Sequence, residues 1–365
     1  MPANQISSNR LTQLLTLLIL ACGLFAGTAR ADNAENTATA ETAATAASEK
    51  DTADAVSEAL KQYERGEYVR AAAVFLTPAA QEAAAVNYAL GNMYALGLGI
   101  PQDYKKAHAR YVEAARKGHA GAMHSLGIIY AKGLGVQKSY LVASEWYTEA
   151  VRQNYVPSMH NLGNLYTVGL GVAQNHEKSR QLYEAAATAG DTGSMCNLGN
   201  LYRYGYGVPM SFSTARKWYE EGAAQNDECC LLNLAWFYFR GWGTPQDLKK
   251  ASELDKTGAL NGSPVAAFNL ARMYHYGMGI DEDAKEALRW YSQSAEKGYV
   301  PAIMQIADIH EQGLLGQPAN ADEAAKWKQR AKDAARENTG RHDPFSSPAY
   351  SLEDNIPAAS PEVAE

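Results

Sequence analysis

The feature that most constrains this chain is an internal repeat of 36 residues. A Leu-Gly, Leu-Ala or Ile-Ala pair recurs seven times at that interval, beginning at Leu90, Leu126, Leu162, Leu198, Leu234, Leu270 and Ile306. A Gly-x-Gly motif follows the first six pairs, and the seventh unit has one extra residue between Gly313 and Gly316. A fixed period of roughly 20 to 50 residues is the signature of a solenoid or a related repeat architecture.

Each repeat is predicted to contain two helices. Leu90, Met93 and Tyr94 have the i, i+3, i+4 spacing of one helical face, and the small Gly91 would let a neighbouring helix approach closely. The Gly-x-Gly motif ends this first helix, because glycine accepts left-handed backbone geometry at little cost. Good N-cap residues then mark the start of a second helix in every unit. They are Asp103, Ser139, Asn175, Ser211, Asp247, Asp283 and Asn320.

One such hairpin cannot bury both of its faces, so stability has to come from stacking on neighbouring hairpins. We therefore predict an all-α fold, a right-handed α-solenoid superhelix of about seven 36-residue helical-hairpin repeats. The repeats cover 83–336, with units starting near residues 83, 119, 155, 191, 227, 263 and 299. The segment 53–82 has the sequence pattern of a helical hairpin but lacks the Gly-x-Gly loop, and we interpret it as an N-terminal capping hairpin.

The repeat pattern, Ala-x-x-x-Leu-Gly-x-x-Tyr-x-x-Gly-x-Gly-Val with Ala and Trp-Tyr on the second helix, resembles the SEL-one-like repeat (SLR). This family is a relative of the tetratricopeptide repeat, and the resemblance covers about Ala83 to Arg336. It implies a scaffold or regulator, as in bacterial envelope proteins of signalling, virulence or polysaccharide secretion and in an adaptor of endoplasmic-reticulum degradation. A cysteine-rich branch associated with β-lactams carries a cysteine pair in each repeat, and this chain lacks those pairs.

The first 31 residues predict a signal peptide. Arg10 precedes the apolar run 11–20, and small residues lead to Ala31, after which we expect cleavage. The run is shorter than the roughly 20 residues that span a bilayer, which argues against a membrane anchor. Residues 19–22 also resemble a lipobox, in which Cys22 would be lipidated and hold the protein on a membrane. The predicted location is periplasmic or secreted, with a lipoprotein as the alternative.

The segments outside the repeats are expected to be disordered. Residues 32–52 are mostly Ala, Thr, Glu and Asn and are interpreted as a linker, and 337–365 are interpreted as a polar, proline-containing tail. The formal net charge of -7 and the pI near 5.7 show that the chain lacks the excess of positive charge that is typical of nucleic-acid-binding proteins. Nucleic acid is therefore excluded as a predicted partner.

Cysteines and histidines carry the main candidates for chemistry. Cys196, Cys229 and Cys230 follow the signal peptide, and Cys196 could form a disulfide with either member of the vicinal pair in an oxidising compartment. We favour small buried side chains at tight helix contacts for all three, over a reactive thiol.

His124, His160 and Cys196 occupy the same position in successive repeats. Neighbouring helices, however, lie about 8 to 10 Å apart, whereas zinc ligands lie about 2.0 to 2.3 Å from the ion. We therefore predict no metal site.

No motif for a catalytic centre or a phosphate-binding loop stands in the required context. We predict a protein that is not an enzyme and has no cofactor.

A binding site should lie where the repeat varies while facing out of the stack. Positions equivalent to Tyr88, Asn92 and Ala95 share a face of the first helix, which by analogy with tetratricopeptide repeats lines the concave groove. The predicted partner-binding residues are Trp236, Phe239, Arg272, His275, Phe268, Arg203 and Asn200. Aromatic and arginine side chains are typical anchors for a protein partner. The alternative is that superhelical twist or the tail covers Trp236 and Phe239, whereas Trp242 is expected to pack inside its loop.

The sequence thus predicts an exported, non-enzymatic repeat scaffold that binds a protein or an extended peptide, as an envelope adaptor or regulator. The alternative is a glycan- or peptidoglycan-associated envelope protein in a secretion or cell-wall complex. Membrane contact is expected only if Cys22 is lipidated.

Overall fold

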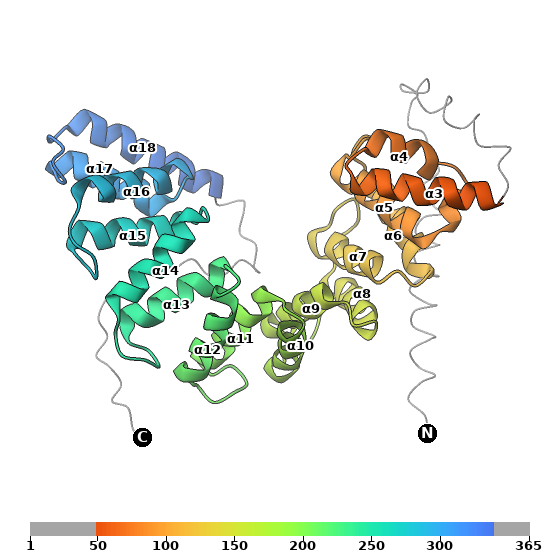
Figure 1. Cartoon of the computed structure of the whole chain (residues 1–365), viewed down its shortest axis with the longest axis horizontal. Helices are drawn as coiled ribbons and strands as arrows, with labels where there is room; N and C mark the ends of the chain where they lie inside the picture. Colours follow the sequence, from red (N-terminus) through yellow and green to blue (C-terminus); the bar gives the residue numbers. More distant parts are fainter. Residues whose placement is uncertain (1–48, 339–365) are drawn as a thin grey trace. The chain divides into compact units, whose positions relative to one another are not determined.

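Helices form all of the regular structure between residues 49 and 338, the part of the chain that the computed structural model describes (Figure 1). Sixteen α-helices and one short 3-10 helix, η1, are found there. Their bounds are α3 Glu49–Glu64, α4 Tyr68–Phe75, η1 Ala80–Glu82, α5 Ala84–Leu96, α6 Tyr104–Arg116, α7 Ala120–Lys132, α8 Tyr140–Arg152, α9 Val156–Val168, α10 His176–Thr188, α11 Thr192–Tyr204, α12 Phe212–Ala223, α13 Glu228–Arg240, α14 Leu248–Leu260, α15 Pro264–Tyr276, α16 Ala284–Glu296, α17 Val300–Gln312 and α18 Ala321–Asn338.

The predicted signal peptide 1–31, Cys22, and most of the predicted linker and tail lie outside the described residues. Helix α3 begins at Glu49, so the last four residues of the segment 32–52 are helical. At the other end, α18 continues to Asn338, two residues past the predicted limit of the repeats. No helix between Glu49 and Asn338 is both long and apolar enough to cross a membrane.

Within the described residues, the chain divides into two compact units, of which the first ends at Gln102 and the second begins at Asp103. In the first unit, α3 and α4 pack on each other and on α5. Ala71, Phe75, Val86, Leu90 and Met93 form its buried core, each with no more than 3% of its surface exposed. The segment 53–82 is therefore helical and shares an apolar core with α5.

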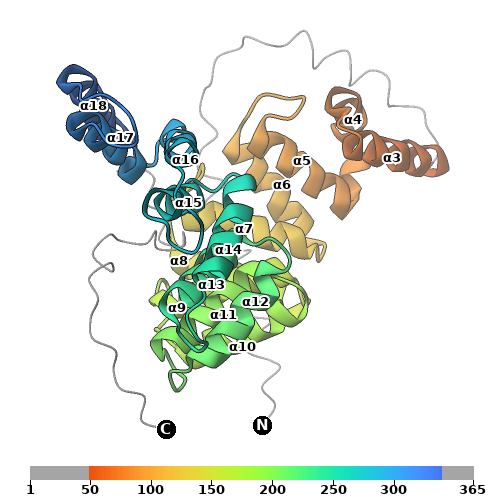
Figure 2. The ribbon, with the colours of Figure 1, turned by 60° about the vertical axis from the view of Figure 1, so that its left-hand side comes forward.

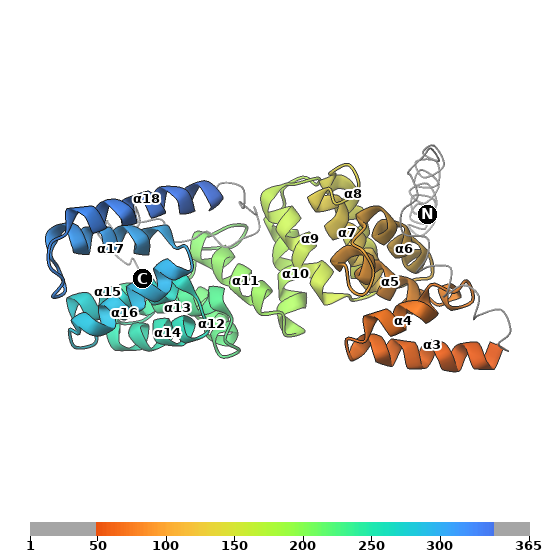
Figure 3. The ribbon, with the colours of Figure 1, turned by 90° about the horizontal axis from the view of Figure 1, so that it is seen from above.

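In the second unit, α6 to α18 pack each on the next along the chain. The first helix of each hairpin is called helix A (α7, α9, α11, α13, α15 and α17), and the second is called helix B (α8, α10, α12, α14, α16 and α18). The last hairpin is drawn in blue in Figures 1, 2 and 3, where α17 and α18 run side by side. By sequence position, α5 and α6 are the corresponding helices of the first repeat.

The helix ends follow the predicted capping residues. In α6, the side chain of Asp103 accepts hydrogen bonds from the backbone N–H groups of Lys105 and Lys106, both at 3.0 Å. The same kind of cap is present at Ser139, Asn175, Ser211, Asp247, Asp283 and Asn320. Each helix A ends on a glycine with left-handed geometry, such as Gly133 with φ of 73°. The predicted caps and glycine stops are confirmed.

In the hairpins of the second, third and fourth repeats, the close contact between the two helices depends on a glycine in helix A and a tyrosine in helix B. Tyr219 is completely buried against Gly199, where a Cβ atom would overlap the tyrosine ring. Tyr147 and Gly127 repeat this contact, as do Tyr183 and Gly163. A side chain on the glycine would push the two helices apart, so this residue sets their separation.

Candidate functional site

A stacked aromatic pair lies on the outer face of α13. The rings of Trp236 and Phe239 have centroids 5.6 Å apart and planes inclined by 12°, and both side chains are partly exposed. The guanidinium of Arg240 lies 4.9 Å from the centroid of the Trp236 ring. The core positions of this helix are filled by Phe237 and Tyr238, which are 0% and 4% exposed. The structure therefore brings Trp236 and Phe239 together and leaves part of each accessible.

Trp242 has a packing role, as predicted. Its ring stacks on Phe212 at 5.0 Å and 9°, and it meets Phe237 edge to face at 5.7 Å. It also contacts Trp236 edge to face at 6.4 Å. Trp242 thus connects the exposed aromatic pair to the apolar core of the fourth and fifth hairpins.

Arg203 and Asn200, two of the predicted groove residues, are engaged within the helix stack. Arg203 is 9% exposed, and its Nη1 donates to Oδ1 of Asn233 at 2.9 Å. Its guanidinium lies 5.2 Å from the centroid of the Trp242 ring. Asn200 accepts a hydrogen bond from the hydroxyl of Tyr219 at 2.8 Å. Arg203 is therefore too buried to contact a partner directly, whereas Asn200 is partly exposed.

Phe268 is also withdrawn from solvent. It is 5% exposed because Tyr291 of α16 and Tyr299, at the start of α17, cover its ring at centroid distances of 5.8 and 5.5 Å. Arg272 and His275 of the same helix are partly exposed. The guanidinium of Arg272 lies 6.0 Å from the Phe268 ring. Of the predicted residues on α13 and α15, Trp236, Phe239, Arg272 and His275 are thus the ones that solvent reaches.

His275 is held by its neighbours. Its Nδ1 atom lies 3.3 Å from the hydroxyl of Tyr291, and its ring stacks on Tyr276 at 4.1 Å. Burial lowers the pKa of His275, with a weaker opposing effect from Glu282 and a further lowering by Arg272. Burial therefore favours the neutral form of the ring, which offers a polar edge to a partner.

The histidine row that suggested a metal site joins adjacent repeats through hydrogen bonds. Nδ1 of His124 lies 2.9 Å from Oγ of Ser158, and burial lowers the pKa of His124 to about 4. Nδ1 of His160 lies 2.9 Å from Oδ2 of Asp191 and 3.0 Å from Oγ of Ser194. Each histidine therefore has its own partners on the following helix A.

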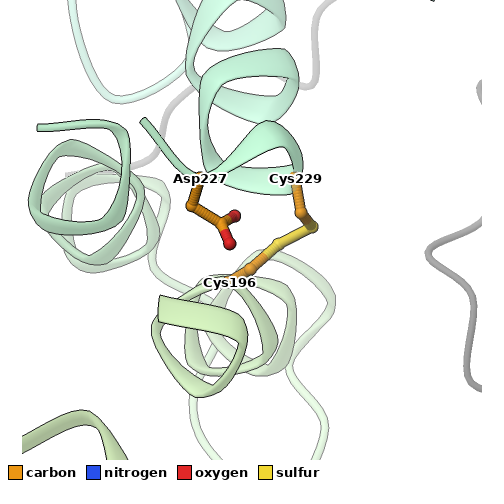
Figure 4. A group of neighbouring side chains, drawn as sticks. All are labelled: Cys196, Asp227 and Cys229. Carbon is orange, nitrogen blue, oxygen red and sulfur yellow. A yellow bond between two sulfur atoms is a disulfide. The ribbon is translucent and has the colours of Figure 1, made fainter. Parts of the chain in front are cut away.

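A disulfide joins Cys196 of α11 to Cys229 of α13, with their Cα atoms 6.1 Å apart (Figure 4). The interpretation of both residues as small packing groups is corrected by this bond. Cys230 is a free, buried cysteine, and burial raises the pKa of its thiol, with Asp227 contributing. The sequence distinguishes the free Cys230 from the disulfide-forming Cys229, because Cys230 stands at a repeat position that otherwise carries small or aliphatic residues. Those residues are Val86, Ala122, Ser158, Ser194, Ala266 and Ala302, all at most 1% exposed.

Seven stretches of the chain match the family model of the Sel1 repeat, at residues 84–119, 120–155, 156–191, 192–227, 230–254, 264–299 and 300–335. The chain belongs to the Sel1 repeat family. No curated protein matches it. The Sel1-repeat scaffold is a fold typical of protein–protein interaction, and proteins built on it are generally non-catalytic.

Two solved Sel1-type structures are similar over most of the chain. A protective antigen of uropathogenic Escherichia coli with an SLR fold is 28% identical, with a TM-score of 0.62. The match covers 79% of this chain and 64% of the antigen, so this chain spans a little under two thirds of that protein. A Sel1 repeat protein from Oxalobacter formigenes is 27% identical with a TM-score of 0.57, covering 76% of this chain and 99% of that one.

The fifth Sel1 repeat departs from its neighbours at Asp255, which the sequence reasoning missed. The helix-B row reads Tyr147, Tyr183, Tyr219, Asp255 and Tyr291 at 36-residue steps, so the break in the tyrosine row was visible in the sequence. Asp255 is 5% exposed and accepts a hydrogen bond from Nδ2 of Asn269 at 3.2 Å. Burial raises its pKa to about 8, against the lowering effect of the Asn269 bond.

The fifth repeat also differs from the third and fourth at position 236. In the third and fourth Sel1 repeats, Asn164 and Asn200 accept the hydroxyl hydrogen bonds of Tyr183 and Tyr219 at 2.6 and 2.8 Å. The fifth repeat has Asp255 in place of the tyrosine and Trp236 in place of the asparagine.

Proposed function

We propose that this Sel1-repeat protein is an exported, non-enzymatic adaptor that binds a protein or an extended peptide through the outer face of α13 and α15. The surface consists of Trp236, Phe239, Arg272 and His275. The observation that carries the proposal is the stacked, partly exposed Trp236–Phe239 pair, which lies at two positions where no other repeat has tryptophan, tyrosine or phenylalanine. Large aromatic side chains and arginine dominate the energetics of protein interfaces.

Preorganisation supports this surface. Three neighbours contact the Trp236 ring and hold it in place. Phe239 stacks on it, Trp242 meets it edge to face, and the guanidinium of Arg240 lies against it. A side chain that is already ordered loses little conformational freedom when a partner binds, so more of the contact energy is retained as affinity. The family supports a binding role, since the Sel1-repeat fold is typical of protein–protein interaction.

Export is supported by two independent features. Arg10, the apolar run 11–20 and Ala31 have the order of a signal peptide and its cleavage site. The Cys196–Cys229 disulfide is the kind of bond that persists in an oxidising compartment such as the periplasm. Mass spectrometry of the mature N-terminus separates the two routes, because cleavage after Ala31 leaves Asp32 first, whereas lipoprotein processing leaves a lipidated Cys22.

The binding proposal is tested by a crosslinked pull-down from an envelope extract of the source organism. The wild-type chain is compared with the variant carrying Trp236→Ala, Phe239→Ala and Arg272→Ala. We expect the wild type to capture a protein that this variant loses, with both chains showing the same helical content.

A second variant controls for the general loss of exposed side chains. Leu141→Ala, Leu260→Ala and Arg289→Ala remove two apolar groups and one arginine from helices B, where Leu141 and Leu260 are 57% and 66% exposed. This variant should retain the partner. Capture by all three chains would place the binding site elsewhere, and capture by none would contradict the adaptor proposal. Retention on insoluble peptidoglycan that depends on Trp236 would assign the surface to glycan.

A further inference from the structure

Three side chains of the kind that binds metal ions meet between α11 and α13. The sulfur atoms of Cys196 and Cys229 and a carboxylate oxygen of Asp227 all lie within 4.8 Å of one another. Figure 4 shows the Asp227 carboxylate in the space between the two helices, beside the disulfide. Cys196 is buried, whereas Asp227 and Cys229 are half-buried. The cluster is therefore reached from one side by solvent, as an exchangeable ion would require.

The two cysteines can serve as ligands only when the disulfide is open. Zinc binds thiolate sulfur at about 2.3 Å, so two sulfurs on one ion are at most about 4.6 Å apart. Cα atoms separated by 6.1 Å allow both sulfurs to reach one ion from facing helices. Two thiolates and one carboxylate fill three positions of a tetrahedral zinc site, and water fills the fourth.

The groups around the cluster are arranged to support such ligands. Nδ2 of Asn233 is a donor to the sulfur of Cys229 at 3.5 Å and to that of Cys196 at 3.6 Å. The hydroxyl of Thr192 donates to Oδ2 of Asp227 at 2.9 Å. Arg203 in turn donates to Asn233, which places a positive charge behind the sulfurs. Donors of this kind fix the orientation of metal ligands, and they stabilise thiolates when the disulfide is reduced.

We propose that reduction of the Cys196–Cys229 disulfide creates a binding site for one Zn²⁺, held by Cys196, Cys229 and Asp227. A dithiol reductant passes two electrons and two protons to the disulfide, which leaves two thiols and the oxidised dithiol. Zn²⁺ then displaces the two thiol protons. A disulfide-bearing oxidant takes the two electrons back, closes the bond and releases the ion. Helices α11 and α13 are thus linked covalently in the oxidised state and through the metal in the reduced state.

The test measures Zn²⁺ bound to the purified full-length protein, oxidised or reduced, after dialysis. A trialkylphosphine serves as the reductant, because it gives two electrons to the disulfide and takes up the oxygen of water. We expect one Zn²⁺ per reduced chain and at least tenfold less per oxidised chain. Co²⁺ added in place of Zn²⁺ should give the thiolate-to-metal absorption of a tetrahedral site. Circular dichroism records the helical content of each state.

Variants identify the ligands. Cys196→Ser should abolish binding, whereas Cys230→Ser should leave it unchanged because the Cys230 thiol is buried away from the cluster. Asp227→Asn keeps the helix cap, since asparagine is as good an N-cap as aspartate, and should weaken binding by roughly tenfold or more. Asp191→Asn alters the equivalent cap of α11 and is the matched control, with no expected change.

Equal Zn²⁺ on oxidised and reduced protein would overturn the proposal, as would retention of the ion by Cys196→Ser. Loss of binding in Cys230→Ser would assign a different ligand set and overturn this one. If reduction lowers the helical content, Zn²⁺ should restore it in the wild type but not in Cys196→Ser, and failure to restore it would also overturn the proposal.

Discussion

Replacing Asp255 by asparagine should change how the stability of the protein depends on pH. The Asp255 carboxyl is fully enclosed, and burial raises its pKa to about 8, although the Asn269 hydrogen bond acts in the opposite direction. In the unfolded chain its pKa is about 3.9. Between these two values the folded state binds more protons than the unfolded state, so the free energy of unfolding falls as the pH rises.

The size of the effect follows from the pKa difference. Each pH unit inside the window costs about 1.4 kcal/mol, so Asp255 lowers the stability by about 4 kcal/mol at pH 7 relative to a pH below 4. An asparagine side chain at this position would not titrate. The difference in unfolding free energy between the Asp255→Asn variant and the wild type should therefore grow by about 3 kcal/mol between pH 5 and pH 7. A constant cost of the new amide cancels in this comparison.

Urea unfolding followed by circular dichroism at pH 5, 6, 7 and 8 measures this difference. Glu253→Gln, which removes an exposed carboxyl from the same helix, is the control and should show no comparable trend. A difference between Asp255→Asn and wild type that stays constant across the series would contradict a raised pKa of Asp255. It would mean that Asp255 does not fold as a protonated, enclosed acid.

Three further changes test the packing and the caps. The Cys196→Ser, Cys229→Ser double variant should lose about 3 to 4 kcal/mol of stability in urea unfolding, because the disulfide spans 33 residues; a variant as stable as Cys230→Ser would contradict this. Gly199→Ala should destabilise the fold by about 1 to 3 kcal/mol, since overlap with the Tyr219 ring outweighs the gain of about 1 kcal/mol in helix propensity; adding Tyr219→Leu should relieve part of the cost, and strict additivity would argue against the contact. Asp247→Ala should cost about 1 kcal/mol in the same assay, because Oδ1 of Asp247 caps α14 by accepting from the backbone N–H of Lys250 at 2.9 Å, whereas Asp247→Asn should be nearly neutral.

The helical hairpins could be predicted because the signals are local and repeated. A capping side chain such as Asp247 and a glycine stop such as Gly133 act within a few residues of where they stand, and each recurs at the same place in the repeat. The close approach of helices A and B was also predictable from the small residue that follows each repeated apolar position, as the Gly199–Tyr219 contact illustrates.

The accessibility of the candidate surface depends on the next hairpin and could not be predicted from one helix. Phe268 shares the outer face of α15 with Arg272, yet Tyr299 of the following hairpin covers it. Arg203 is buried because Asn233, on the next helix A, accepts its hydrogen bond. Helical periodicity gives the face on which a residue lies, whereas the size and polarity of side chains about 30 positions later decide whether that face stays open.

The choice of disulfide partner was harder, because Cys229 and Cys230 differ by one step along the helix. One step rotates a side chain by about 100°, which directs Cys229 to Cys196 and Cys230 to Gly222 of α12, in the preceding hairpin. The row of small buried residues in which Cys230 stands was the usable signal.

The proposed anchor for a protein partner is the Trp236–Phe239 pair. The most direct test measures the dissociation constant of the isolated partner by calorimetry for wild type, for Trp236→Ala with Phe239→Ala, and for Leu260→Ala as a control. Loss of a hot spot worth about 2 kcal/mol should weaken binding roughly 30-fold. The aromatic variant should show this loss and Leu260→Ala an unchanged constant, whereas equal affinity of all three chains would contradict an anchor at Trp236 and Phe239.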